Sequence, residues 1–310
     1  MSATPPKIRL GTRSSPLARW QADWVTSQLV ELGIEVEQVL ITTQGDVRTG
    51  SLSQIGGQGL FTKEIQRALL DNRVDLAVHS LKDLPTAPTP GLTLAAIPPR
   101  ETTHDCLVSN SVKSLQELPK GARLGTGSLR RRAQALFIRP DLVVEEIRGN
   151  VDSRLRKLDE GQYDAIMLAE AGLKRLGLDA RMTQILPLEL MLPAVGQGAL
   201  GLETREDDIV TQALLMPLDH APSHAAIDAE RSMLATLRGG CLAPIGASAT
   251  VSAEGELTLI GVVVRVDGEK RISAQAHGPM TDAVQIGKAV AEDLLSQGAS
   301  ELIAQSRPAT

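Results

Sequence analysis

Val74-Asp75-Leu76-Ala77-Val78-His79-Ser80-Leu81-Lys82-Asp83-Leu84-Pro85 is the stretch around which the chain is organised. It begins as a short apolar run, which is typical of a strand buried in a sheet. The run then becomes polar and stops at Pro85, so we expect a strand that ends at Asp83. Ligands of open α/β sheets bind beyond the carboxyl ends of the strands. A carboxylate beside Lys82 at such an end is placed to exchange protons with a substrate, although the local pattern alone favours solvated charges.

The elements before this strand predict a parallel sheet. Residues 7–10 and 34–42 have the pattern of strands, a helix is expected over residues 16–32, and a second helix begins at Thr62. Strands that alternate with helices are typical of parallel βαβ units. Residues 85–99 are rich in proline and glycine, and we expect them to form a surface connection into a second domain.

A possible anion site precedes the first helix. Ser15 suits the N-cap and Pro16 the first helical position, which places Arg13 and Ser15 at a helix N-terminus. Such an N-terminus attracts anions through its free N–H groups and its dipole. A capping serine beside a surface arginine is an equally good interpretation.

The middle of the chain repeats the strand–helix pattern and carries many arginines. Strands are expected at residues 122–125, 142–147 and 164–169, and a helix follows each of them. Several basic residues follow the strand ends: Arg130, Arg131, Arg132, Arg148, Arg154 and Arg156. Arginines gathered at one edge of a sheet predict a pocket for several carboxylates or phosphates.

The last third predicts a small α+β domain. Alternating strands are expected at residues 245–251, 256–266 and 271–278, followed by a helix over 281–297. Before them, the two glycines of Gly239-Gly240-Cys241 free the backbone to present the thiol. A small buried thiol in a turn is the commoner arrangement for such a sequence, and it is the interpretation we keep for Cys106.

Composition narrows the range of functions. The net charge of −5 and the 2% of aromatic residues argue against nucleic-acid binding. The 23 arginines against nine lysines favour recognition of oxyanions. Two cysteines far apart give neither a disulfide framework nor a zinc site, and the five histidines lack metal-ligand spacing. With no signal peptide or membrane-spanning run in the sequence, we expect a cytoplasmic protein without a metal.

Seven motifs in one order together resemble the porphobilinogen deaminase family, whose members are also called hydroxymethylbilane synthases. They are Arg13-x-Ser15-Pro16-Leu17-Ala18, Gly56-Gly57-x-Gly59-Leu60-Phe61, His79-Ser80-x-Lys82-Asp83-x-Pro85, Gly125-Thr126-x-Ser128-Leu129-Arg130-Arg131, Arg148-Gly149-Asn150-Val151, Leu192-Pro193-Ala194-Val195-Gly196-Gln197-Gly198-Ala199 and Gly239-Gly240-Cys241. The resemblance covers nearly the whole chain.

The resemblance implies three α/β domains. The first two would be doubly wound and similar to type II solute-binding proteins around a cleft. The third would be a small α+β domain with a three-stranded antiparallel sheet. We expect domain 1 to comprise residues 1–99 and 198–217, domain 2 residues 100–197, and domain 3, which carries the cofactor-anchoring cysteine, residues 218–310.

The resemblance also implies the reaction. The enzyme would be a transferase of tetrapyrrole and haem biosynthesis that condenses four porphobilinogen molecules head to tail, releases ammonia, and frees hydroxymethylbilane by hydrolysis. A dipyrromethane cofactor, attached covalently to Cys241, would prime the chain. We expect porphobilinogen as the only partner, no nucleic acid or membrane, and a monomer.

The roles of individual residues follow from the same motifs. Asp83 matches the catalytic aspartate. Cofactor binding is implied for Cys241, Lys82, Thr126, Ser128, Arg130 and Arg131. Substrate binding is implied for Arg13, Ser15, Phe61, Arg148, Arg154, Arg175 and Gln197. Gln58 departs from the family, where lysine is frequent, so a contact to a substrate carboxylate would be weaker there.

Two other functions fit parts of the sequence. A solute-binding module would share the two-domain cleft, but the absent signal peptide and the Cys241 motif count against it. An RNA-binding protein could use Arg130-Arg131-Arg132, but the net charge and the scarcity of aromatic residues count against that. Its binding would weaken steeply as salt rises.

Overall fold

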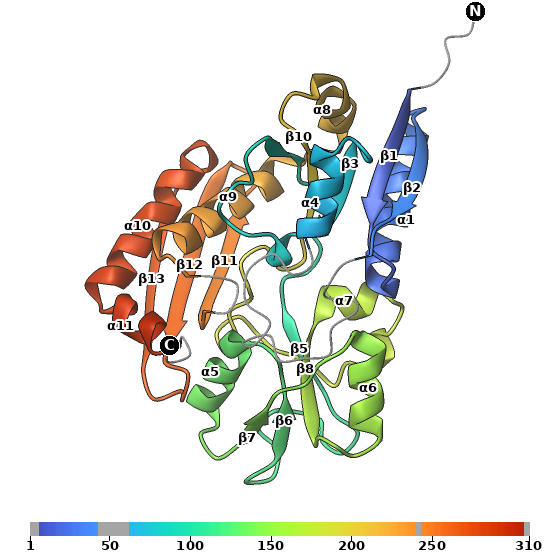
Figure 1. Cartoon of the computed structure of the whole chain (residues 1–310). Coiled ribbons are helices and arrows are strands. Elements are labelled where there is room, and N and C mark those ends of the chain that lie inside the picture. The colour runs from blue at the N-terminus through green and yellow to red at the C-terminus, as the bar shows by residue number, and fades with distance from the viewer. Residues whose placement is uncertain (1–5, 43–61, 240–242, 307–310) are drawn as a thin grey trace, which may run out of the picture. The chain divides into compact units, whose positions relative to one another are not determined.

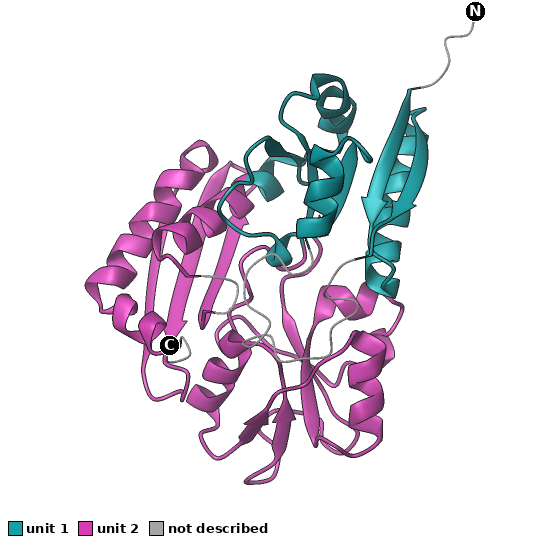
Figure 2. Cartoon of the chain, in the orientation of Figure 1, with its two compact units in different colours: residues 1–100, 199–224 teal, residues 101–198, 225–310 magenta. Residues whose placement is uncertain are grey.

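The computed structural model describes residues 6–42, 62–239 and 243–306, which fall into two compact units. Unit 1 comprises residues 1–100 and 199–224, and unit 2 comprises residues 101–198 and 225–310 (Figures 1 and 2). The division of the sequence into three domains stays a prediction.

Unit 1 is built on a five-stranded sheet with the order β2-β1-β3-β10-β4. The strands are β1 (Lys7–Thr12), β2 (Glu35–Leu40), β3 (Leu76–Ser80), β4 (Leu92–Ala96) and β10 (Leu200–Arg205). β1 pairs in parallel with β2 and β3, whereas β10 runs antiparallel to both β3 and β4. The expected parallel sheet is therefore mixed, because a strand from far along the chain inserts between β3 and β4.

Helices cover both faces of this sheet. Leu76 and Val78 of β3 pack in one cluster with Val25 and Leu29 of α1 (Pro16–Glu31). Ala77, on the opposite face of the same strand, packs with α4 (Lys63–Leu70). Alternate residues of β3 thus pack into two hydrophobic cores, one on each face of the sheet. This explains why β3 is a continuous apolar run. The short helix α8 (Ile209–Leu215) follows β10.

The local details of unit 1 differ from the expectation in two places. β3 ends at Ser80, and Leu81–Asp83 form a single 3-10 turn instead of continuing the strand. The proline-rich connection contains β4, which the sequence pattern missed because prolines flank it. Thr62 occupies the N-cap position of α4, although its side chain makes no capping hydrogen bond.

Unit 2 contains a second five-stranded sheet with the order β7-β6-β8-β5-β9. The strands are β5 (Asp105–Val108), β6 (Arg123–Gly125), β7 (Val143–Glu145), β8 (Ala165–Ala169) and β9 (Gln184–Ile185). β6 is parallel to β7 and β8, and β5 is antiparallel to β8 and β9. The strand directions and spatial order match those of unit 1: a parallel trio, one antiparallel strand, and a final strand parallel to the trio.

The helices of this sheet also lie on both faces. Ala135 of α5 (Leu129–Ile138) packs with Leu124 and Met167. Leu155 of α6 (Val151–Asp159) and Leu173 of α7 (Glu170–Arg175) pack on the other face.

The rest of unit 2 is a three-stranded antiparallel sheet formed by β11 (Ile245–Val251), β12 (Glu256–Val264) and β13 (Arg271–Pro279). α10 (Ala283–Ser296), α11 (Ala299–Ala304) and α9 (Ala221–Thr236, which begins in unit 1) share its apolar core. A small apolar cluster of Ala133, Leu192, Val262 and Val264 joins α5 to β12. The fold class is thus the expected one: two mixed α/β sheets and a small α+β part with three antiparallel strands.

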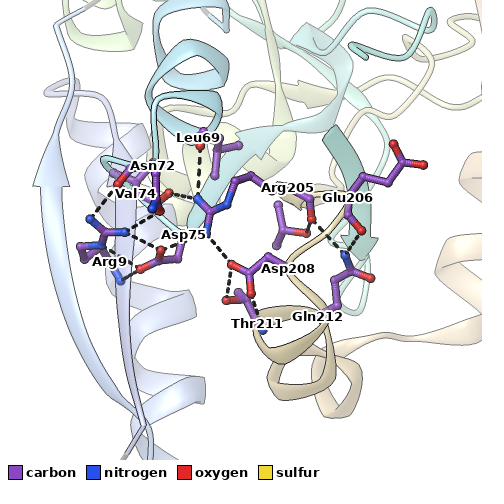
Figure 3. A network of polar contacts seen from close by, with 11 residues as sticks. Arg9, Leu69, Asn72, Val74, Asp75, Arg205, Glu206, Asp208, Thr211 and Gln212 are labelled. Atoms are coloured by element: carbon purple, nitrogen blue, oxygen red, sulfur yellow. Dashed lines mark hydrogen bonds and ion pairs between the residues drawn. The ribbon is translucent and has the colours of Figure 1, made fainter. Parts of the chain in front are cut away.

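An ion-pair network holds the edge of unit 1 where β3 begins (Figure 3). Asp75 accepts hydrogen bonds from Arg9 Nη2 at 2.7 Å and Arg9 Nε at 3.0 Å, and from Arg205 Nη2 at 3.2 Å. Arg205 Nη2 also donates to Asp208, whose carboxylate caps α8 by accepting from the Thr211 amide. The network connects β1, β3, β10 and α8 at the edge of the sheet opposite to Asp83.

This network predicts acid-sensitive stability. Burial acts to raise the pKa of Asp75, but hydrogen bonds from Arg9 and Arg205 outweigh burial and hold the pKa below its usual range. A carboxylate with a lowered pKa stabilises the fold above its unfolded pKa, about 3.9, and that stabilisation is lost as the pH falls through the folded value. We expect Asp75→Asn to lower the free energy of unfolding by about 1–3 kcal/mol at pH 7. In urea titrations, the difference in the free energy of unfolding between this variant and the unsubstituted chain should become smaller below about pH 4.

The matched control is Asp207→Asn, which changes an exposed carboxylate one residue before Asp208. An equal loss of stability in this control, or a loss in Asp75→Asn that is the same at every pH, would contradict the prediction.

Candidate active site

A concavity in unit 1 opens at the carboxyl ends of β1 and β3. Its empty volume is about 460 Å³, and part of this space is open solvent. Its lining residues are Arg13, Ser15, Leu17, Ala18, Gln21, Thr62, Ile65, Val78, His79, Ser80 and Asp83. Three residues singled out in the sequence, Arg13, Ser15 and Asp83, therefore lie around one space, because β1 and β3 are parallel neighbours that end at the same edge.

Two helix N-termini border this concavity. α1 begins after Ser15, whose hydroxyl accepts a weak hydrogen bond of 3.4 Å from the Ala18 amide. α4 begins after Thr62, which is 2% exposed and whose Oγ1 has no hydrogen-bond partner. The positive ends of the two helix dipoles, together with the Arg13 guanidinium, favour an anionic ligand. Asp83 is exposed and Lys82 half-buried in the 3-10 turn.

A buried polar group supports the same edge of the sheet. His79 Nε2 lies 2.9 Å from Glu203 Oε2, and Gln66 Nε2 donates to Glu203 Oε1 at 2.9 Å. Ser80 and Gln21 exchange hydrogen bonds through their side chains. The motif around Asp83 contains His79 and Ser80, but their partners on α1, α4 and β10 could not be identified from sequence spacing.

The remaining described candidate residues lie in unit 2. Ser128 is the N-cap of α5 and accepts from the Arg131 amide, and Thr126 Oγ1 accepts from the Ser128 amide. Because both hydroxyls act as acceptors in these bonds, each keeps its own proton to donate.

Arg130 and Arg131 are buried instead of exposed on a helix face. Asp105 Oδ2 accepts from Arg130 Nη1 at 2.5 Å, and Asp105 Oδ1 accepts from Arg131 Nη2 at 2.7 Å and Nε at 3.0 Å. Gln197 Nε2 donates to the same Oδ1 at 2.9 Å. Burial acts to raise the pKa of Asp105, but the charges of the two arginines outweigh it and hold the pKa far below its usual range. Burial lowers the pKa of Arg130.

The other predicted arginines make separate contacts in unit 2. Arg148 Nε donates to Glu146 at 2.7 Å, and Arg154 Nε donates to the Gly149 carbonyl at 2.9 Å. Arg175 Nη2 donates to the Gly198 carbonyl at 2.7 Å, and burial lowers its pKa. Arg156, by contrast, is exposed and lies 3.9 Å from Glu160 one helical turn away. Phe61, Gln58 and Cys241 lie outside the described residues.

Cys106 is buried, as predicted, but it lies on β5 and not in a turn, and its Sγ lies 3.5 Å from the Leu168 carbonyl. Burial raises its pKa to about 12. At pH 8 only roughly one thiol in ten thousand would be ionised, and the thiolate is the reactive form.

We therefore expect iodoacetamide at pH 8 to leave Cys106 unmodified in the folded chain and to alkylate it in urea. The mass of the peptide that contains Cys106 measures the alkylation. Cys106→Ala identifies the peptide. Alkylation at similar rates in the folded and unfolded chains would contradict the burial.

Comparison with known sequences identifies the family. Residues 8–213 match the profile described as "Porphobilinogen deaminase, dipyromethane cofactor binding domain", and residues 224–296 match "Porphobilinogen deaminase, C-terminal domain". The chain belongs to the porphobilinogen deaminase family. The porphobilinogen deaminase of Syntrophotalea carbinolica is 50% identical over 96% of this chain and 95% of that protein. The porphobilinogen deaminase of Brevibacillus brevis is 48% identical over 96% of this chain and 97% of that protein.

Similarity to solved structures is weaker. A nutrient binding protein from Burkholderia cenocepacia bound to methionine has a TM-score of 0.41 and 13% identity, over 67% of this chain and 90% of that chain. The fold class follows from the sheet topology. Within the part of the chain that is described, no helix combines the length and apolar character needed to cross a membrane.

Proposed function

We propose that this member of the porphobilinogen deaminase family uses Asp83 for proton transfer and charge stabilisation, and uses its arginines to hold carboxylates. The chain is a transferase that condenses four porphobilinogen molecules head to tail on a dipyrromethane primer, releases ammonia, and frees hydroxymethylbilane by hydrolysis. The assignment of roles rests chiefly on one observation: Asp83, Arg13 and Ser15 line the same concavity.

Asp83 acts where the substrate loses its amine. As an acid, it assists departure of the amine when the C–N bond breaks and ammonia leaves. As a carboxylate, it stabilises the methylenepyrrolenine cation that remains, and it receives the proton displaced from the pyrrole carbon when the new C–C bond forms. Stabilisation of the developing positive charge is the larger contribution, because a fixed carboxylate needs little reorganisation during the reaction.

Arg13 and Ser15 bind a carboxylate of the incoming substrate. Each porphobilinogen carries an acetate and a propionate group, so the site must neutralise two negative charges per unit. A guanidinium beside a helix N-terminus provides a charged fork and the positive end of the helix dipole for this purpose. We assign Arg148, Arg154, Arg175, Gln197 and Phe61 to substrate binding as well, on their match to the family motifs.

The residues assigned to the cofactor fit a carboxylate-bearing group. Arg130 and Arg131 share the single carboxylate of Asp105, and Arg130 Nε is buried without a hydrogen-bond partner. This cluster therefore keeps a net positive charge that an anionic group would balance. Thr126, Ser128 and Lys82 would add hydrogen bonds, and Cys241 would be the covalent anchor. When bound, the dipyrromethane supplies the free pyrrole carbon to which the first substrate is joined.

The setting of the enzyme is also part of the proposal. The buried free thiol of Cys106 is compatible with a reducing compartment, so we place the enzyme in the cytoplasm. Family resemblance supports a monomer with porphobilinogen as its partner.

The role of Asp83 can be tested by kinetics. We expect Asp83→Asn to lower kcat by at least about 100-fold with little change in KM, because charge stabilisation acts in the transition state. Asp83→Glu, which keeps the charge but moves it by one methylene, should retain more activity. A rise in KM alone in Asp83→Asn would refute the assignment.

The anchor can be tested by intact mass. The purified chain should be heavier than its sequence by two deaminated porphobilinogen units, and Cys241→Ala should lack this addition, whereas Cys106→Ala should keep it. A chain that gains no adduct even after incubation with porphobilinogen would refute the proposed anchor.

A further inference from the structure

The buried carboxylate of Asp105 is absent from the residue roles assigned above. Asp105 is the first residue of β5 and is 0% exposed. Side chains from two separate segments donate to it: Arg130 and Arg131 from the first turn of α5, and Gln197 from the turn that follows Leu192. All three donors are predicted cofactor or substrate ligands, and Asp105 accepts hydrogen bonds from each of them.

Charge counting shows that this cluster is not neutral. The side chains of Arg130 and Arg131 are 4% and 7% exposed, and they share one carboxylate. Two guanidiniums and one carboxylate leave one buried positive charge, and an unbalanced buried charge is unfavourable. A purely structural ion cluster would gain stability from a second acid, whereas a site for an anionic ligand needs the remaining charge.

The guanidiniums are also fixed at defined places. Arg130 Nη1 donates to the Leu192 carbonyl at 2.7 Å as well as to Asp105, and Arg131 Nη1 donates to the Met167 carbonyl at 3.0 Å. Arginine is flexible and loses much rotamer freedom when it binds a ligand, so fixing it beforehand lowers that cost. These carbonyls are backbone groups. Among the described residues, Asp105 is the only side-chain anion within 4 Å of either guanidinium.

We propose that Asp105 is a positioning residue for cofactor binding. It fixes Arg130 and Arg131 and leaves one net positive charge, which a carboxylate of the dipyrromethane balances. This inference rests on the proposed roles of Arg130 and Arg131. Asp105 itself need not touch the cofactor, because it acts through the two guanidiniums.

Asp75 provides a matched control. It too is a carboxylate that two arginines bind, Arg9 and Arg205, but it lies in the network at the start of β3, and none of these residues is a predicted ligand. Removing either carboxylate should lower stability. Only removal of Asp105 should affect the cofactor.

The experiment compares full-length Asp105→Asn and Asp75→Asn with the unsubstituted chain. For each, the urea midpoint gives stability, and intact mass after incubation with porphobilinogen gives the fraction of chains that carry the dipyrromethane adduct. We expect both variants to have a lower urea midpoint, and the adduct fraction to fall at least threefold in Asp105→Asn alone. An unchanged adduct fraction in Asp105→Asn, or an equal fall in Asp75→Asn, would overturn the proposal.

A second variant covers the case in which Asp105→Asn does not fold. Asp105→Glu keeps the charge but displaces the carboxylate by one methylene, so it should fold and still show a reduced adduct fraction. A full adduct fraction in Asp105→Glu would overturn a positioning role, and so would failure of both variants to fold, because Asp105 would then serve the fold itself. Failure of the proposed function is a separate result: the unsubstituted chain would then form no adduct.

Discussion

One buried turn, Leu192 to Gly198, is held between two carboxylates, and unit 2 depends on this arrangement. On one side Asp105 accepts from Gln197, and on the other Glu230 of α9 accepts from the Gly196 amide at 2.8 Å. Glu230 is 0% exposed and also accepts from the Ala249 amide of β11 at 2.9 Å. The turn therefore connects the five-stranded sheet with the three-stranded sheet through charge-assisted hydrogen bonds, which are stronger than those between neutral groups. The apolar cluster between α5 and β12 lies between the same two parts.

Much of the local structure was predictable because its causes are local. Ser15, Ser128 and Asn150 cap the helices that they precede, and the capping hydrogen bonds lie within three residues of each. The three C-terminal strands are joined by short turns at Gly255 and Gly268, so their pairing follows from adjacent sequence. β10 was not predictable as the strand between β3 and β4, because its pairing joins segments more than 100 residues apart. That single insertion made the parallel sheet a mixed one.

The candidate site was predictable as a set of residue types but not as a set of contacts. The motifs singled out Asp83, Arg13 and Ser15, and the order of the strands explains why all three reach one concavity. The burial of Arg130 and Arg131 against an internal carboxylate could not be inferred, because the gathered arginines predicted only a pocket for the carboxylates or phosphates of a ligand. It depends on Asp105, whose carboxylate lies at the start of a strand that the sequence pattern missed. Thr62, seen in the sequence only as a helix cap, also lines the concavity without making the capping bond.

The position of β10 also sets the order in which the two five-stranded sheets can be completed during translation. The five strands of the unit 2 sheet all lie between Asp105 and Ile185, so the ribosome has synthesised every one of them before it reaches Leu200. β3 and β4 are made much earlier, but they remain without the strand that joins them until Arg205 has left the ribosome. Although unit 1 begins at the N-terminus, its sheet receives its last strand after the five-stranded sheet of unit 2 is complete in sequence. The nascent chain meanwhile carries unpaired strand edges, which are prone to misassociation.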